Sequence, residues 1–177
     1  MEIATERLRI RNFREEDNDA LFEYLSNPAI YVFEPGKPIT ADIAIELSSE
    51  RSKYNDFLAV ELVSENRMIV HLYFRQIDPT KYATWELGYI VHPLYQKRGY
   101  ATESAKAITR YGFQELGVHR IISHCSPDNT SSWKVLEKIG MRREGISRKN
   151  IFFRKTASGD PIWQDTYEYA MLSDDVS

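Results

Sequence analysis

The chain has 177 residues, of which 42% are hydrophobic and 28% are charged. This composition is typical of an ordinary soluble globular protein and argues against a disordered, collagen-like or low-complexity chain. The formal net charge at pH 7 is −3, so the chain lacks the diffuse positive charge of a general nucleic-acid or anionic-membrane binder. We therefore expect a single domain over residues 1–177, with no direct nucleic-acid or membrane binding.

The cysteine content and the N-terminus indicate where the protein resides. Cys125 is the sole cysteine, which excludes an internal disulfide and a metal site with two thiolates from this chain. The first residues carry charges where a signal peptide would need an apolar stretch, and no later run approaches the ~18 apolar residues of a membrane span. We predict a cytoplasmic protein.

The first half of the chain predicts a strand, two helices and three further strands. Residues 7–11 alternate polar and apolar, the period of a half-buried strand. Acidic residues then open a helix that ends near Leu25, and Thr40 caps a second helix that ends near Tyr54. Extended segments follow at residues 57–63, 68–77 and 83–92. Turn-like residues separate these segments, so we expect a meander.

The second half predicts strand-helix-strand units. Residues 99–116 have apolar positions at helical spacing, and Gly117 ends this helix. A short strand at residues 120–125 precedes a helix that Asn129 caps and Gly140 ends. The last strands are expected at residues 142–154 and 162–172. This order predicts an α+β, or mixed α/β, domain.

The most informative segment is the turn that leads from the strand at residues 83–92 into the next helix. This turn is basic and contains Gly99, and a helix N-terminus offers unpaired N–H groups and a positive dipole end. A basic, glycine-containing turn at a helix N-terminus can bind a diphosphate through its backbone N–H groups. Neither GxxxxGK[ST] nor GxGxxG precedes this helix, so the two familiar nucleotide loops are absent. The residues alone leave open whether this is an anion site or an ordinary turn.

Two motifs identify a family resemblance. Gln96-x-x-Gly99-x-Ala101 resembles the [RQ]-x-x-G-x-[GA] acyl-CoA signature of the GNAT N-acetyltransferase superfamily. Residues 129–132, Asn-Thr-Ser-Ser, followed by Leu-Glu-Lys-Ile-Gly-Met at residues 136–141, are similar to the next helix of that superfamily. The motifs occur in the expected order and separation. The resemblance implies a GNAT-like domain, with a central twisted mixed sheet flanked by helices and acetyl-CoA as co-substrate.

The wider pattern is most similar to one branch of this superfamily. Glu86-Leu87-Gly88-Tyr89 and the closing Asp165-Thr166-Tyr167 resemble the branch that contains the ribosomal-protein N-terminal alanine acetyltransferases. That branch also holds members of unknown acceptor. The resemblance therefore implies an amine acceptor without naming it.

The resemblance also implies which residues hold acetyl-CoA. Backbone groups of Ile90 and Val91 would pair with the pantetheine arm as a short added strand. The side chains of Gln96 and Arg98 would lie at the rim of the pyrophosphate site. The pyrophosphate itself would be bound by the N–H groups of Lys97, Arg98, Gly99, Tyr100, Ala101 and Thr102.

The following helix would hold the thiol end of the cofactor. By the resemblance, Asn129 would hydrogen-bond the pantetheine and Ser132 would lie near the sulfur. Many relatives carry a Tyr after the position of Leu136 to protonate the thiolate, but Glu137 stands there in this chain. That role therefore falls to Ser132 or to water. From the residues alone, Asn129 can equally be a plain helix cap and Ser132 a small packing residue.

The acceptor amine must lose a proton before or during its attack on the thioester, and a carboxylate can accept it. Glu86 is the predicted base, because the period of two places it on one strand face with Gly88 and Ile90. The alternative is an exposed or ion-paired carboxylate. Asp165 is a second acidic candidate, either for binding a cationic acceptor or for structuring the last strands.

The histidines do not predict a metal site. His119 and His124 lie five residues apart in a predicted strand, so their side chains point to opposite faces. We expect His71 and His92 to be solvated or hydrogen-bonded. Accordingly, we predict no metal.

These observations predict an N-acetyltransferase that moves an acetyl group from acetyl-CoA to a primary amine by direct attack. A peptide α-amine titrates near 8 and a lysine amine near 10.4, so a carboxylate relay more readily supplies a neutral peptide N-terminus. A polyamine, amino acid or aminoglycoside acceptor is the alternative. A non-catalytic acyl-CoA-binding regulatory module is the competing class. We expect a monomer or a homodimer.

Overall fold

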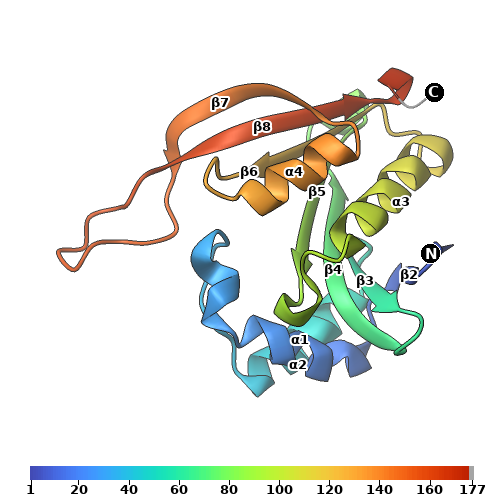
Figure 1. Ribbon diagram of the computed structural model, residues 1–177, viewed down its shortest axis with the longest axis horizontal. Helices are drawn as coiled ribbons and strands as arrows, with labels where there is room; N and C mark the ends of the chain where they lie inside the picture. Colours follow the sequence, from blue (N-terminus) through green and yellow to red (C-terminus); the bar gives the residue numbers. More distant parts are fainter. Residues whose placement is uncertain (176–177) are drawn as a thin grey trace.

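A computed structural model describes residues 1–175. Its centre is an eight-stranded sheet with the order β1-β2-β3-β4-β5-β6-β8-β7 (Figure 1). The strands are β1 (Glu2–Ala4), β2 (Leu8–Asn12), β3 (Phe57–Leu62), β4 (Arg67–Gln76), β5 (Thr84–Val91), β6 (Arg120–Cys125), β7 (Arg142–Ile151) and β8 (Gln164–Leu172). Neighbouring strands are antiparallel except β5 and β6, which are parallel. The predicted mixed α/β fold is confirmed.

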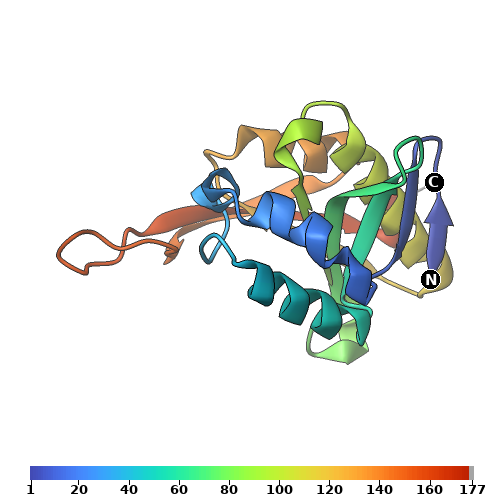
Figure 2. The same ribbon diagram turned by 90° about the horizontal axis from the view of Figure 1, so that it is seen from below.

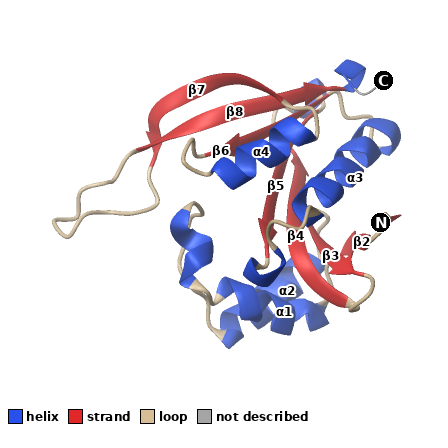
Figure 3. Ribbon diagram, viewed as in Figure 1, coloured by secondary structure: helices blue, strands red, loops and turns tan. Residues whose placement is uncertain are grey.

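Helices pack on both faces of this sheet (Figure 3). They are α1 (Asn18–Leu25), α2 (Ala41–Ser52), α3 (Tyr100–Glu115) and α4 (Thr130–Lys138), and a 3-10 helix, η2 (Pro28–Val32), lies between α1 and α2. One apolar core joins α3 and α4 to the sheet, and a second core joins α1 and α2 to the other face. Among residues 1–175, no helix is both long and apolar enough to cross a membrane.

Most element boundaries agree with the sequence prediction. The three strands β3, β4 and β5 form the expected meander, and Thr40 Oγ1 accepts the predicted capping bond from the Ile43 N–H at 3.4 Å. β1 was not predicted, because three residues are too few to show an alternating pattern. The last two strands are shorter than predicted: residues 152–163 form a loop that contains Gly159 and Pro161.

The β7–β8 hairpin projects from the body of the molecule and carries this loop at its end (Figure 2). Arg154 of this loop contacts the body of the molecule. The Arg154 guanidinium donates hydrogen bonds to the carbonyl oxygens of Tyr31 at 2.7 Å and Val32 at 3.0 Å. The hairpin is therefore attached to η2, which lies beside its loop (Figure 1).

A buried ion cluster fixes the start of α1 against the sheet. Arg11 of β2 donates to both carboxylate oxygens of Asp17, at 2.8 and 2.7 Å, and to Glu61 of β3 at 2.6 Å. All three side chains are buried. Burial by itself would raise the pKa of Glu61, but hydrogen bonds from Arg11 and Arg9 outweigh this effect and lower it. Each buried charge in the cluster thus has a partner.

Removing Arg11 should be strongly destabilising. In Arg11→Met the Asp17 carboxylate stays buried without its cation, so we expect the free energy of unfolding to fall by about 3–5 kcal/mol. The control is Arg142→Ala, which breaks the exposed pair with Asp175 and should cost about 0–1 kcal/mol. Urea denaturation followed by circular dichroism measures both. Equal, small losses would contradict a structural role for the cluster.

Candidate active site

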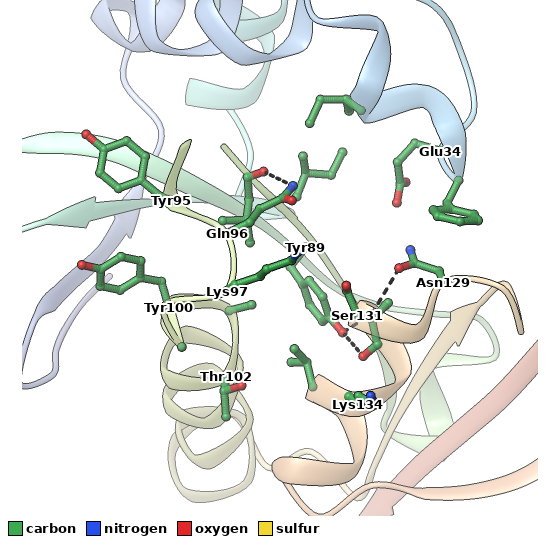
Figure 4. A pocket seen from close by; sticks show the side chains of 18 of the residues that line it. Glu34, Tyr89, Tyr95, Gln96, Lys97, Tyr100, Thr102, Asn129, Ser131 and Lys134 are labelled. Atoms are coloured by element: carbon green, nitrogen blue, oxygen red, sulfur yellow. Dashed lines mark hydrogen bonds between the residues drawn. The ribbon is translucent and has the colours of Figure 1, made fainter. Parts of the chain in front are cut away.

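A cavity of about 550 Å³ lies where the two halves of the sheet separate (Figure 4). Its walls come from η2 and the residues that follow it, from the end of β5, from the turn before α3 and from α4. The cavity therefore joins segments that are far apart in the sequence.

The cavity exists because the pairing of β5 with β6 stops early. The two strands are in register only from Thr84 to Glu86, opposite residues 120–122. Just beyond, the Ser123 hydroxyl donates to the Leu87 carbonyl oxygen at 2.7 Å. Beyond this bond, the described residues of β5 and β6 form no further parallel pairs. The edge of β5 that faces β6 is therefore without a described partner strand from Gly88 onward.

The unpaired edge of β5 presents backbone polar groups to the cavity. The His92 N–H donates to the Ile69 carbonyl oxygen of β4 at 2.8 Å. Because peptide groups alternate along an antiparallel pair, those of Tyr89 and Val91 face away from β4, toward the gap, whereas those of Ile90 face β4. The prediction that backbone groups of Ile90 pair with the pantetheine arm is therefore wrong, because β4 already occupies them. An extended ligand with amide groups can add to this edge as a strand does.

The turn before α3 has the geometry of an anion site. Lys97 has φ 61° and Gly99 has φ 87°, so two residues of this short turn lie in the left-handed region. Alternating conformations of this kind direct successive N–H groups to one side, where they bind anions. The positive dipole end of α3, which has 16 residues, adds to the attraction.

The N-terminal segment braces this turn from behind. The Arg7 guanidinium donates to the Arg98 carbonyl oxygen at 3.1 Å and pairs with Glu103, in the first turn of α3, at 2.6 Å. It also lies over the Tyr100 ring, 4.5 Å from the centroid. The sequence analysis missed Arg7, because a pattern of alternating residues does not reveal such a distant contact.

The opposite wall is the N-terminus of α4. The Asn129 side chain accepts a hydrogen bond from the Ser132 N–H at 3.2 Å, which confirms the predicted cap. The Tyr89 hydroxyl donates to the Ser132 carbonyl oxygen at 2.9 Å and lies 3.1 Å from the Ser132 hydroxyl (Figure 4). Burial raises the pKa of Tyr89 well above its usual value, so the phenol keeps its proton. Tyr89 and Ser132 thus form a pair of hydroxyls inside the cavity.

Comparison with known proteins identifies the architecture. A family model described as Acetyltransferase (GNAT) domain matches residues 7–142. The chain is 38% identical over 176 residues to the uncharacterized N-acetyltransferase YnaD of Bacillus subtilis (strain 168), and the match covers 99% of each chain. The chain belongs to the GNAT family of acetyltransferases. The expected family resemblance is confirmed, and so is the assignment to the N-acetyltransferases.

Solved structures agree with this assignment. An acetyltransferase of the GNAT family from Bacillus anthracis has a TM-score of 0.89 and 37% identity, and the alignment covers 98% of this chain and 99% of that chain. The ribosomal-protein-S5-alanine acetyltransferase of Vibrio fischeri has a TM-score of 0.81 at 20% identity and covers 100% and 99%. The second likeness shows a shared fold.

GNAT enzymes use acetyl-CoA as co-substrate, and the residues of this chain fit that molecule. The left-handed turn and the α3 N-terminus suit a pyrophosphate, and the free edge of β5 suits the amides of the pantetheine arm. Lys97, Lys134 and Lys138 also line the cavity. Their positive charges complement the phosphates of CoA.

Most residues predicted for the site do line the cavity. These are Ile90, Val91, Gln96, Lys97, Gly99, Tyr100, Ala101, Thr102, Asn129 and Ser132. Arg98 and Glu86 lie outside the described lining. The Arg98 guanidinium lies over the Tyr95 ring, 5.6 Å from its centroid, and the Arg98 carbonyl oxygen accepts a hydrogen bond from Arg7. The Gln96 side chain donates to the Val91 carbonyl oxygen at 3.3 Å.

Glu86 has a partner that the sequence did not indicate. The Glu86 carboxylate lies 3.0 Å from His124 Nδ1, and this hydrogen bond raises the pKa of His124. His119 precedes β6, so the expected placement of both histidines in one strand is wrong for His119. Within residues 1–175, no group of three or more His, Cys, Asp or Glu side chains is placed to hold a metal ion.

The remaining acidic candidates make structural contacts. The Tyr169 hydroxyl donates to Glu137 at 3.0 Å, so the residue that stands where many relatives have Tyr is engaged with β8. The Lys149 N–H donates to Asp165 at 2.8 Å and stabilises the irregular part of the β7–β8 hairpin.

The buried His71 is hydrogen-bonded, as expected. Its Nδ1 atom shares a hydrogen bond with the Tyr24 hydroxyl at 2.6 Å.

One carboxylate that lines the cavity was not predicted from the sequence. Glu34 follows η2 and contributes to the wall opposite α4 (Figure 4). Burial raises its pKa to about 7. The segment around Glu34 lies in a loop without periodicity, so no sequence signal distinguished it from other surface acids.

Gly99 allows a direct test of the anion site. A side chain at φ 87° is strained by about 1–2 kcal/mol, and a Cβ there would lie 3.3 Å from the Arg7 guanidinium. We expect Gly99→Ala to shift the turn and weaken CoA binding about 5- to 30-fold, the equivalent of that strain. Isothermal titration calorimetry measures the affinity.

Gly117 provides the matched control. It also has a positive φ, of 65°, but nothing lies within 4 Å of a Cβ built there, and it lies beyond the other end of α3. Gly117→Ala should lose similar stability and keep wild-type CoA affinity. Equal affinities in the two variants would contradict the assignment of the turn.

Proposed function

We propose that this GNAT enzyme, as one catalytic domain over residues 1–177, acetylates the α-amine at the N-terminus of a protein or peptide. Residues 176 and 177 lie outside the part that the structure describes. One observation supports this acceptor: among the described residues that line the cavity, Glu34 is the one carboxylate. A polyamine carries several ammonium groups and would favour several carboxylates, whereas a peptide N-terminus presents one.

The surroundings of the η2 wall support the same acceptor. A second, smaller pocket, which Glu34 also lines, contains the cationic side chains of Lys37 and Arg154. Positive charge there disfavours a polycation. The fold shared with the ribosomal-protein-S5-alanine acetyltransferase is compatible with a peptide acceptor.

In the proposed reaction the neutral amine attacks the thioester carbonyl carbon. The new C–N bond forms, the C–S bond breaks, the nitrogen loses one proton and CoA leaves as the thiolate. The turn before α3 holds the phosphates, and Asn129 with the free edge of β5 orients the pantetheine arm. Ser132 donates a hydrogen bond to the departing sulfur, and Tyr89 holds Ser132 in place. No covalent enzyme intermediate is needed.

The sequence predicts Glu86 as the base, and the structure gives it a partner outside the cavity. Its carboxylate shares a face of β5 with Gly88 and Ile90 and is held by His124. It lies outside the described lining of the cavity, so a water molecule would have to connect it to the amine. Its contribution is measurable in a Glu86→Gln variant.

Ser132 should affect the chemical step rather than CoA binding. A hydrogen bond to a charged group contributes about 1.5–3 kcal/mol, so we expect Ser132→Ala to lower kcat about ten- to hundredfold. The affinity for CoA should change little. Stopped-flow detection of the released thiol, with calorimetry as the control, checks both values. A wild-type kcat would leave Ser132 a packing residue.

The acceptor is identified by an acetyl-CoA turnover screen with mass detection of the product. The panel contains peptides with free N-termini, lysine peptides with blocked N-termini, polyamines, amino acids and aminoglycosides. We expect acetylation of the peptide α-amine. Exclusive acetylation of small amines would refute the peptide acceptor, and tight CoA binding without any transfer would indicate a non-catalytic module.

A further inference from the structure

Glu34 lies on a segment that is firmly held at the entrance of the active site. The segment begins at η2, where the Asn27 side chain accepts a capping bond from the Ala29 N–H at 2.9 Å. The Tyr31 hydroxyl donates to the Leu25 carbonyl oxygen at 2.8 Å, and Arg154 holds the carbonyl oxygens of Tyr31 and Val32. These bonds come from three directions. The position of Glu34 is therefore set by the fold.

Burial of the Glu34 carboxylate lowers the stability of the folded protein, because no cation of the described residues compensates for it. It is half-buried, and burial alone accounts for the rise of its pKa to about 7, with no hydrogen bond or charged partner contributing among residues 1–175. A buried carboxylate without a cation destabilises the folded protein. The charged or titratable side chains that line the two pockets with it are Lys97, Lys134, Lys138, Tyr89, Tyr95 and Tyr100 in the cavity and Tyr31, Lys37 and Arg154 in the second pocket. None of them neutralises the carboxylate.

Glu34 faces the same space as the groups that receive the thiolate. Glu34 and Tyr89 line the same cavity, and the charge of Glu34 adds to the rise in the pKa of Tyr89 that burial causes. The Tyr89 hydroxyl in turn contacts Ser132. Figure 4 shows Glu34 reaching into the cavity from the η2 side, across from Asn129 and Ser131 of the opposite wall. An amine between these walls meets Glu34 on one side and the thioester on the other.

We propose that Glu34 is the catalytic base, which contacts the acceptor amine directly. The ionised carboxylate binds the entering ammonium group and accepts one of its protons, which leaves the amine neutral for attack on the thioester. The second proton released as the C–N bond forms passes to solvent or to the departing thiolate. Glu86, bonded to His124 outside the cavity lining, then acts at most in positioning. This inference rests on the proposed amine acetylation but not on which amine is the acceptor.

Two isosteric variants compare the candidate bases. We expect Glu34→Gln to lower kcat/KM about 10²-fold or more, the usual contribution of a general base, and Glu86→Gln to lower it by less than about tenfold. The assay uses whichever amine the acceptor screen identifies. Transfer to small amines alone would refute the peptide acceptor and leave this comparison intact. A strong loss in Glu86→Gln with wild-type activity in Glu34→Gln would overturn the proposal.

The pH profile tests the same role independently. With a pKa of about 7, Glu34 is mostly protonated at lower pH and becomes a competent base as the pH rises. The wild-type kcat/KM should therefore rise with a slope of about one up to pH 7 and level off there, below the pKa near 8 of an α-amine. In Glu34→Gln the inflection near pH 7 should disappear, and the rise should continue to the pKa of the acceptor itself. An inflection that stays near pH 7 in Glu34→Gln would contradict the proposal.

Stability and CoA binding provide readouts that do not depend on activity. The folded-state pKa of Glu34 lies above the unfolded value, so the protein loses stability as the pH rises from about 4.5 to about 7. We expect Glu34→Gln to raise the melting temperature at pH 8 and to keep the wild-type thermal shift with CoA. A lower melting temperature would assign Glu34 a structural role and overturn the proposal.

Discussion

The whole site depends on the early end of the pairing between β5 and β6. Beyond Glu86 and Ile122 the two parallel strands separate, and the peptide groups of Tyr89 and Val91 have no partner strand on that side in the part of the chain that the structure describes. A continuous ladder would close this gap and satisfy those groups inside the sheet. The separation instead opens an edge in the middle of the molecule, with core on both sides. Such an edge is available to an extended ligand and protected from other proteins.

The elements beside the gap make the separation stable. The Ser123 hydroxyl satisfies the Leu87 carbonyl oxygen, and Tyr89 reaches across to the first turn of α4. The N-termini of α3 and α4 therefore both point toward the gap, and their dipoles add positive potential. On the other side of α3, Thr5 and Arg7 bind Glu103 at 2.6 and 2.7 Å and hold the helix start in place. The first residues of the chain thus support a turn almost a hundred residues away.

Charge divides the cavity into two ends. Lys97 and the N-terminus of α3 form the part of the cavity that suits phosphates, and Glu34 lies on the η2 side, across from the N-terminus of α4 (Figure 4). The ionised form of Glu34 lowers the stability of the fold, because burial raises the pKa of this carboxyl to about 7 and no charged partner among the described residues offsets the rise. A buried charge without a partner is typical of a functional group, because the ligand supplies the opposite charge when it binds. The Arg154 bonds from the β7–β8 hairpin offset part of the cost by holding η2 in position.

The sequence by itself determined the four main helices and seven of the eight strands, the cap at Asn129, the turn at Gly99 and the family, because these depend on residues close together in the chain. It also placed Glu86, Gly88 and Ile90 on one face of a strand, as the register of β5 confirms. Only the tertiary structure decided what those residues meet. Glu86 faces His124 from another strand, Tyr89 contacts Ser132 from another helix, and Glu34 enters the cavity from a loop without any pattern. Local periodicity predicts to which face of its own element a side chain points. The strand order and the gap between β5 and β6 arise from packing between distant segments. This packing decides which side chains share a site.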